Sequence, residues 1–157
     1  MGVERQEVEI LPYSRAAPSL SSLVLAETIA PRGAARSGKD YDPLVYGSAV
    51  VTPSASREFA RAGQLQVYFH AYNVADASNR GRSPYQYQMT LLRDGVPITQ
   101  SKPLPLETSA SHPLGGFLQT SRLSLAPLDP GSYALEVALS LPDGRNRTAR
   151  SVSFRVR

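Results

Sequence analysis

The stretch LDPGSYALEV, residues 128–137, decides the fold. Asp129, Pro130 and Gly131 form a predicted turn, and after it every second residue is apolar. Because successive side chains of a β-strand point to opposite faces, this alternation places Tyr133 and the later apolar residues on one buried face. The stretch therefore predicts a rigid turn that fixes where a core strand begins.

The same period-two alternation recurs elsewhere in the chain. It is present in residues 64–75, 85–92 and 151–157. Asp94 and Gly95 follow the second of these segments and predict a two-residue hairpin turn, in which both central residues need positive φ. About eight or nine strands at short spacing, with no clear helical pattern, predict an all-β fold. We expect a two-sheet antiparallel β-sandwich of the immunoglobulin or fibronectin-III type.

Three further segments fit this plan less regularly. Residues 21–29 favour a strand, with a short helix as the alternative. Residues 44–53 predict a strand with a bulge at Gly47. Residues 116–125 predict another strand, in which Leu118 is out of step with the later leucines. All three are counted among the expected strands.

The alternating segments also predict which residues meet in the core. Phe69, Leu135, Val137 and Phe154 should be buried together between the two sheets. Tyr133 follows a turn, and β-sandwiches often place at such a position a tyrosine whose hydroxyl binds nearby backbone. The alternative is that its ring simply packs at the edge of the core.

The length of 157 residues suits a single domain that can bury a hydrophobic core without covalent staples. We expect one β-sandwich domain over residues 1–157. Within it, residues 1–19 are a lead-in or edge strand. Residues 30–44 and 102–116 are rich in turn-forming residues and are expected to be long loops.

The composition excludes several classes of protein. With 41% hydrophobic and 19% charged residues, the chain belongs with ordinary soluble domains and not with disordered ones. It has no cysteine, which excludes disulfides and thiol catalysis. The net charge of +4 comes mostly from arginine, and we attribute it to codon usage in preference to nucleic-acid binding. No segment approaches the about 18 apolar residues of a membrane span.

The order of several segments resembles a region of known exported proteins. The segments are SSLVLAETI, LVYGSAVVTPSASREFARAGQLQVYFHAYNV, YQYQMTLLRDG, LSLAPLDPGSYALEVALSLPDG and SVSFRVR. Together, over residues 20–157, they resemble the C-terminal β-sandwich region of bacterial exported proteins related to von Willebrand factor A domains, and of some proteins of the GWxTD class. The Asp-x-Ser-x-Ser metal motif is missing, so the chain does not resemble a von Willebrand A domain itself.

This resemblance implies where the chain occurs, and it does not imply a reaction or a ligand. It implies a terminal accessory module on a longer exported protein, and it brings no catalytic residue and no cofactor. The start, MGVERQEVEI, has no apolar signal-peptide segment. The chain is therefore expected to be either cytoplasmic or a piece of a longer exported protein. With the resemblance, we expect an extracytoplasmic location.

Catalytic and metal-binding groups are few. His70 lies mid-strand and His112 lies in a Ser/Pro loop, and the nucleophile-elbow motif G-x-S-x-G does not occur. Two histidines without clear carboxylate partners do not predict zinc. Asp40 and Asp42 are the densest acidic pair, but loop acids that cap turns are favoured over calcium ligands. We expect no enzyme, no metal and no cofactor.

One strand face carries residues suited to binding. Aromatic side chains with a polar group suit mixed polar and apolar contacts, and three of them share a face of residues 64–75: Tyr68, His70 and Tyr72. Gln66 lies on the same face. The binding interpretation is a polar and aromatic surface for a glycan or a protein. The alternative is that the face is covered by one of the long loops, residues 30–44 or 102–116.

A second candidate site is basic. Arginines are concentrated near the C-terminus without an acidic residue among them, and the candidate contacts are Arg145, Arg147, Arg155 and Arg157. One interpretation is an anionic partner such as a cell-surface polymer. The other is a charged edge strand that discourages aggregation between sheets.

Two functions are consistent with these patterns. The first is a non-catalytic interaction module that binds protein or glycan as part of a larger exported bacterial protein. The second is a structural spacer or capping domain, which has no ligand of its own and contacts only the other domains of its chain. An enzyme is a distant third, and neither a nucleic-acid partner nor a membrane span is expected.

Overall fold

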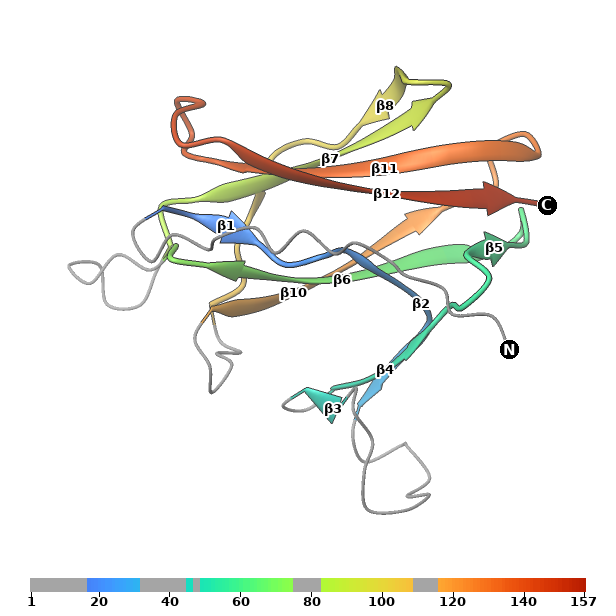
Figure 1. Ribbon diagram of the computed structural model, residues 1–157, viewed down its shortest axis with the longest axis horizontal. Helices are drawn as coiled ribbons and strands as arrows, with labels where there is room; N and C mark the ends of the chain where they lie inside the picture. The colour runs from blue at the N-terminus through green and yellow to red at the C-terminus, as the bar shows by residue number, and fades with distance from the viewer. Residues whose placement is uncertain (1–16, 32–44, 47–48, 75–82, 109–115) are drawn as a thin grey trace, which may run out of the picture.

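The fold is an all-β sandwich, as the sequence predicts. The computed structural model describes residues 17–31, 45–46, 49–74, 83–108 and 116–157. These residues form twelve strands and no helix, and the strands make up two six-stranded sheets that lie face to face (Figure 1). Eight of the strands are five residues or longer, and the other four have two residues each. The described residues contain no helix able to cross a membrane.

The first sheet is built around one long central strand. Its strands are β1 (Ser19–Leu20), β2 (Val24–Pro31), β3 (Val45–Tyr46), β4 (Ala49–Pro53), β6 (Gln64–Tyr72) and β10 (Phe117–Ser124). β10 pairs with β6 from Gln64 to Ala71 on one edge, and β1 and β2 pair with different parts of the other edge. Beyond β6, β2 continues into a pairing with β4 that projects from the sandwich (Figure 1).

The second sheet contains the stretch that decides the fold. Its strands are β5 (Glu58–Phe59), β7 (Gln86–Arg93), β8 (Val96–Gln100), β9 (Leu104–Pro105), β11 (Gly131–Ser140) and β12 (Thr148–Val156). β11 lies at the centre, between β7 and β12. β5 pairs with β12 in parallel, and the other described pairs are antiparallel. β8 and β9 both pair with β7, away from β11.

The core lies between the sheets where the alternating faces meet. Phe69, Leu135, Val137 and Phe154 are all buried in a single cluster, which confirms the core prediction. The ring of Phe69 contacts the ring of Tyr87 from the opposite sheet edge-to-face, with centroids 5.4 Å apart. Such pairs add about 0.5–1.5 kcal/mol to the free energy of area burial, so this contact helps to fix how the sheets face each other.

Tyr133 combines both roles considered for it. Its hydroxyl donates a hydrogen bond of 2.7 Å to the carbonyl of Asp129, across the turn that precedes β11. Its ring is buried and stacks on Phe154, with centroids 5.8 Å apart. The Arg93 guanidinium lies 5.6 Å from the centroid of the same ring. The turn, the strand entry and the core are therefore tied together by one side chain.

The hairpin predicted at Asp94 and Gly95 is confirmed. Both residues have positive φ, 51° and 78°, and the turn joins β7 to β8. The strand expected at residues 21–29 is present as β2, which begins later, at Val24, and extends to Pro31 at the start of the region assigned to a loop. The short strand β9 likewise lies inside the predicted loop 102–116.

The prediction for residues 44–53 is wrong in one respect. They form two strands, β3 and β4, which pair with each other antiparallel, and not a single bulged strand. Gly47 lies outside the described residues, as do residues 1–16 of the predicted lead-in. A register shift is present instead in β2, between Ala26 and Thr28, where the strand leaves β6 to join β4.

Candidate functional site

The three predicted aromatic residues lie together on the outer face of the first sheet. The Tyr68 hydroxyl and His70 Nε2 are 2.5 Å apart and share a hydrogen bond. The rings of His70 and Tyr72 are stacked, with centroids 5.8 Å apart. Alternation along β6 places all three on the face opposite Phe69, as the sequence predicts.

Most of this aromatic face is buried. Only 4% of Tyr68 and 5% of His70 is exposed, and Tyr72 is partly buried. Tyr68 belongs to a small apolar cluster outside the main core, whose other members are Ala26, Val51, Val24, Ile29 and Leu118. These residues come from β2, β4 and β10, so Tyr68 is enclosed by the strand pair that projects from the sheet and by β10. Direct contact of Tyr68 with a partner would require these residues to move.

Gln66 lies on the same face of β6. Its side chain forms hydrogen bonds with the β2 backbone where β2 diverges from β6. The register shift in β2 removes Glu27 and Ile29 from the regular ladder with β6. The side-chain oxygen of Gln66 accepts a hydrogen bond from the Ile29 backbone N–H, at 3.1 Å. Its side-chain nitrogen donates to the Glu27 carbonyl, at 3.4 Å. An amide suits this position because it supplies both a donor and an acceptor.

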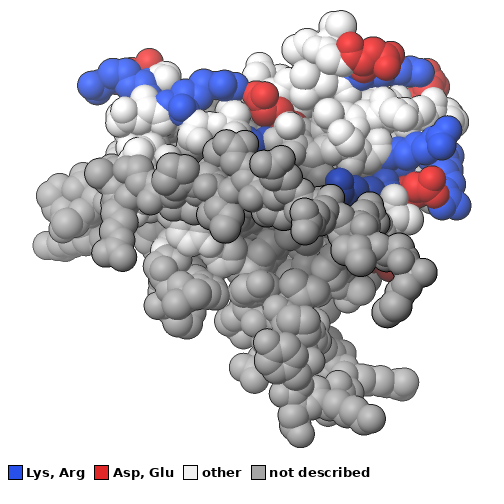
Figure 2. Space-filling model, viewed as in Figure 1, with Lys and Arg blue, Asp and Glu red and all other residues white. Residues whose placement is uncertain are grey.

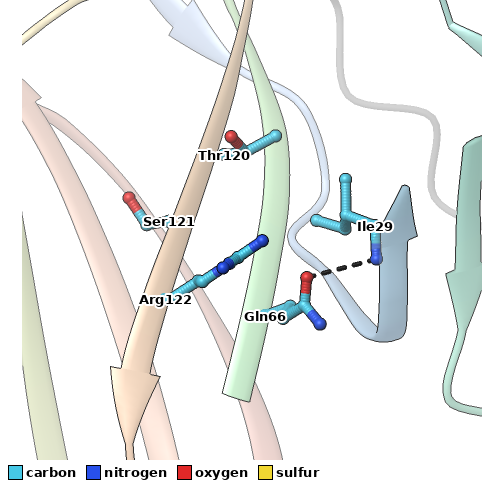
Figure 3. A pocket seen from close by; sticks show the side chains of 5 residues that line it. All are labelled: Ile29, Gln66, Thr120, Ser121 and Arg122. Carbon is cyan, nitrogen blue, oxygen red and sulfur yellow. Dashed lines mark hydrogen bonds between the residues drawn. The ribbon is translucent and has the colours of Figure 1, made fainter. Parts of the chain in front are cut away.

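A pocket of about 290 Å³ lies beside Gln66 (Figure 3). Its lining residues are Ile29 from β2, Gln66 from β6, and Thr120, Ser121 and Arg122 from β10. Cross-strand pairing sets Arg122 opposite Gln66 and Thr120 opposite Tyr68. Figure 3 shows Arg122 extending toward Gln66 and Ile29, while Ser121 points to the other side of β10. Sequence reasoning missed Arg122 and Thr120 because no local pattern pairs them with β6.

Three of the four arginines proposed to contact an anionic partner are already paired with acids. Arg145 binds Asp143 at 2.6 Å, Arg147 binds Glu136 at 2.7 Å, and Arg157 binds Glu58; the fourth is Arg155. The pKa of Asp143 is lowered, first by the backbone N–H of Arg145 and then by its side chain. Figure 2 shows basic and acidic side chains interspersed over the second sheet. This pairing weakens the positive potential that the sequence alone suggests.

Arg155 is the exception among these arginines. It is exposed, and no acidic side chain in the described part of the chain forms an ion pair with it. It lines a hollow of about 350 Å³ together with Pro130, Gly131 and the Arg157–Glu58 pair. The predicted basic site is therefore reduced to one unpaired guanidinium beside a neutralised pair.

The edge of the second sheet exposes apolar side chains. Every residue of β8 is exposed, and Val96 and Ile98 are 62% and 47% exposed. They are the exposed large hydrophobic residues of the described chain. β8 also contains Pro97, and Ile98 is the extra residue of a register shift against β7, because Leu91 pairs with Thr99 and Leu92 with Pro97. Proline and irregular pairing both discourage the addition of a further strand at a sheet edge.

The described residues hold no group of three or more His, Asp or Glu side chains able to bind a metal ion. His112, Asp40 and Asp42 lie outside the described residues. We expect that removing divalent ions with a chelator leaves the melting temperature of the chain unchanged. Differential scanning calorimetry with and without chelator would measure this. A fall of several degrees would redirect attention to Asp40 and Asp42 as ligands.

No family model matches the chain, and no curated protein matches it.

Proposed function

We propose that this chain is a non-catalytic interaction module that contacts a partner protein through β8. The observation that carries this proposal is the exposure of Val96 and Ile98 on one short edge strand. Exposed apolar groups that gather at one place on a soluble domain favour a protein contact over a glycan contact. Elsewhere on the described surface, the aromatic and basic candidates are largely buried or paired.

The edge geometry favours recognition through side chains. Pro97 has no backbone N–H to donate, and the register shift at Ile98 makes the edge irregular. A partner that added a regular strand would lose hydrogen bonds at this edge. A partner that received Val96 and Ile98 in an apolar depression would not meet this obstacle. The proposed contact is therefore a small apolar patch on a rigid hairpin.

The topology supports an immunoglobulin or fibronectin-III type of sandwich as part of this proposal. In such folds, three neighbouring strands of one sheet include the last two of the chain, and a tyrosine near the start of the penultimate strand binds upstream backbone. The order β7–β11–β12 and the Tyr133 hydrogen bond match this arrangement. Folds of this type host many unrelated functions, so the fold alone does not identify the partner.

The cellular setting belongs to the same proposal. We place the chain in a larger exported bacterial protein, outside the cytoplasm, as one of its accessory domains. The support is the resemblance of residues 20–157 to the terminal sandwich region of such proteins.

A structural spacer or cap is the second candidate. The burial of Tyr68 and His70 under residues of their own chain favours it, as do the ion pairs of Arg145, Arg147 and Arg157. In this function the partner of β8 would be another domain of the same chain.

A pair of matched variants tests the proposed contact. Replacing Val96 and Ile98 with aspartate should abolish capture of the partner by the immobilised chain, because two charges would have to be desolvated at the contact. The control replaces Thr99 and Gln100 with aspartate, which adds the same charge to the same exposed strand. Bacterial envelope fractions provide the sample, and mass spectrometry identifies captured proteins. If both variants retain the same proteins as the parent, β8 is not the contact and the spacer function is favoured.

A further inference from the structure

The pocket beside Gln66 has the properties of a small-ligand site on the first sheet. We infer that it binds the carboxylate of a small sugar acid, with Arg122 as the residue that holds the charge. The pocket lies on the outer face of the first sheet, whereas β8 lies at the edge of the second. The inference therefore stands independently of the proposed protein contact.

The side of this pocket formed by β2 and β6 is preformed before any ligand binds. β2 pairs with β6 up to Ala26 and then diverges to join β4. The two hydrogen bonds of Gln66 to the β2 backbone fix the point of divergence. The pocket is the space that this divergence leaves beside β10. A wall held by such bonds needs little ordering when a ligand enters, so little conformational entropy is lost on binding.

Arg122 supplies a guanidinium that the described residues leave unpaired. It is exposed, and none of the ion pairs among the described residues includes it. No residue that lines the pocket is acidic. A guanidinium offers parallel N–H donors in a planar fork that matches a carboxylate in two bonds. Arg145, Arg147 and Arg157 already bind acids of their own chain, whereas no acid within the described ranges pairs with Arg122.

The other lining groups favour a hydroxylated ligand. Thr120 is exposed and lies two residues from Arg122 on the same face of β10, where its hydroxyl can donate or accept a hydrogen bond. Ile29 adds an apolar surface on the opposite wall. Sugar acids combine a carboxylate with hydroxyl groups and an apolar C–H face. A volume of about 290 Å³ is at the small end of ligand pockets, which suits a single sugar unit.

An acidic peptide fits this place less well. Peptides are often recognised through main-chain hydrogen bonds to an unpaired strand edge. At the pocket, both edges of β6 are occupied, because Gln66 lies between Ala26 of β2 and Arg122 of β10. The pocket therefore offers side-chain groups to a ligand and no free edge of β6.

Titration of the full chain with defined probes tests the inference. Sodium D-glucuronate should shift the backbone amide signals of residues 120–122 and of Gln66 in a two-dimensional NMR spectrum. Glucose has the ring without the charge and should produce no comparable shift. Acetate has the charge without the ring and should bind about tenfold more weakly than glucuronate. N-acetylglutamate represents an acidic peptide side chain and should also bind more weakly than glucuronate.

Variants identify the residue responsible. Arg122→Ala should weaken glucuronate binding by about tenfold, and Arg122→Lys should weaken it less, because lysine keeps the charge and loses the fork. Arg155→Ala is the matched control, since it removes an exposed arginine from the other sheet, and it should leave binding unchanged. An unaltered amide signal of Ile29, whose N–H binds the Gln66 side chain, in the free Arg122→Ala variant would show that the pocket wall is intact.

Several results would overturn the inference. Equal glucuronate affinity in the parent and in Arg122→Ala would exclude Arg122 as the binding group. Equal affinity for acetate and glucuronate would exclude a contact with the sugar ring. Tighter binding of N-acetylglutamate would assign the pocket to an acidic side chain and not to a sugar. An equal loss of affinity in Arg155→Ala would indicate general charge attraction without a specific site.

Discussion

Replacing Phe69 with alanine should lower the free energy of unfolding by about 3–5 kcal/mol. Phe69 is completely buried at the centre of β6, and its ring contacts Tyr87 across the interface between the sheets. The substitution removes the ring from a well-packed interior and leaves a cavity that the rigid strands on both sides cannot easily fill. The loss therefore combines lost apolar burial with lost contacts around the cavity.

Chemical denaturation at constant temperature would measure this effect. The control is Phe117→Ala, which removes the same ring from the first residue of β10, where it is only partly buried. Its cost should be clearly smaller, because less apolar surface is lost from the core. A loss below about 1 kcal/mol for Phe69→Ala would contradict the assignment of the inner face of β6.

The elements that the sequence predicts well are those whose pattern is local. β6, β7, β11 and β12 have period-two alternation over most of their length, and the structure confirms them as strands with the predicted core residues buried. The Asp94–Gly95 turn was predictable because its two residues are suited to positive φ. Local preference and tertiary packing agree in these segments, which makes them predictable from one sequence.

The features that the sequence did not predict depend on pairing over long distances. The antiparallel pairing of β3 with β4, and of β4 with β2, involves segments without a strong alternation. The acidic partners of Arg147 and Arg157 are Glu136 and Glu58, which pairing between strands brings close. A run of arginines with no acid among them therefore gave a misleading impression of free positive charge, although Asp143, the partner of Arg145, lies just before it.

The candidate site also depends on pairing between distant segments, which a local pattern does not predict. Alternation correctly placed Tyr68, His70 and Tyr72 on one face, because that depends only on β6. Whether the face is open depends on β2, β4 and β10, and their residues pack around Tyr68. The pocket at Arg122 requires both the pairing of β10 with β6 and the divergence of β2. Neither can be derived from a motif within one segment.

β10 places a polar residue, Gln119, in the core, at a position where alternation predicts an apolar one. Leu118 is out of step with the later leucines, as the sequence indicates, and it pairs with His70 on the outer face. The inward position next to it is occupied by Gln119, which is only 1% exposed. Its side-chain oxygen accepts a hydrogen bond from the Glu107 N–H at 3.0 Å, and its nitrogen donates to the Glu107 carbonyl at 2.9 Å. Gln119 thus ties the segment that follows β9 of the second sheet to the first sheet.

Replacing Gln119 with leucine should lower the free energy of unfolding by about 2–4 kcal/mol, because a backbone donor and a backbone acceptor lose their partners at about 1–3 kcal/mol each. Leucine is similar in size, so the main loss is in hydrogen bonds and not in packing. Denaturant unfolding measures the loss, and amide hydrogen exchange should accelerate at Glu107 in particular. Gln64→Leu is the control, because Gln64 is exposed on β6 and the same substitution there should change stability by about 0.5 kcal/mol or less. Unchanged stability and unchanged exchange at Glu107 in Gln119→Leu would show that this amide does not hold the two sheets together.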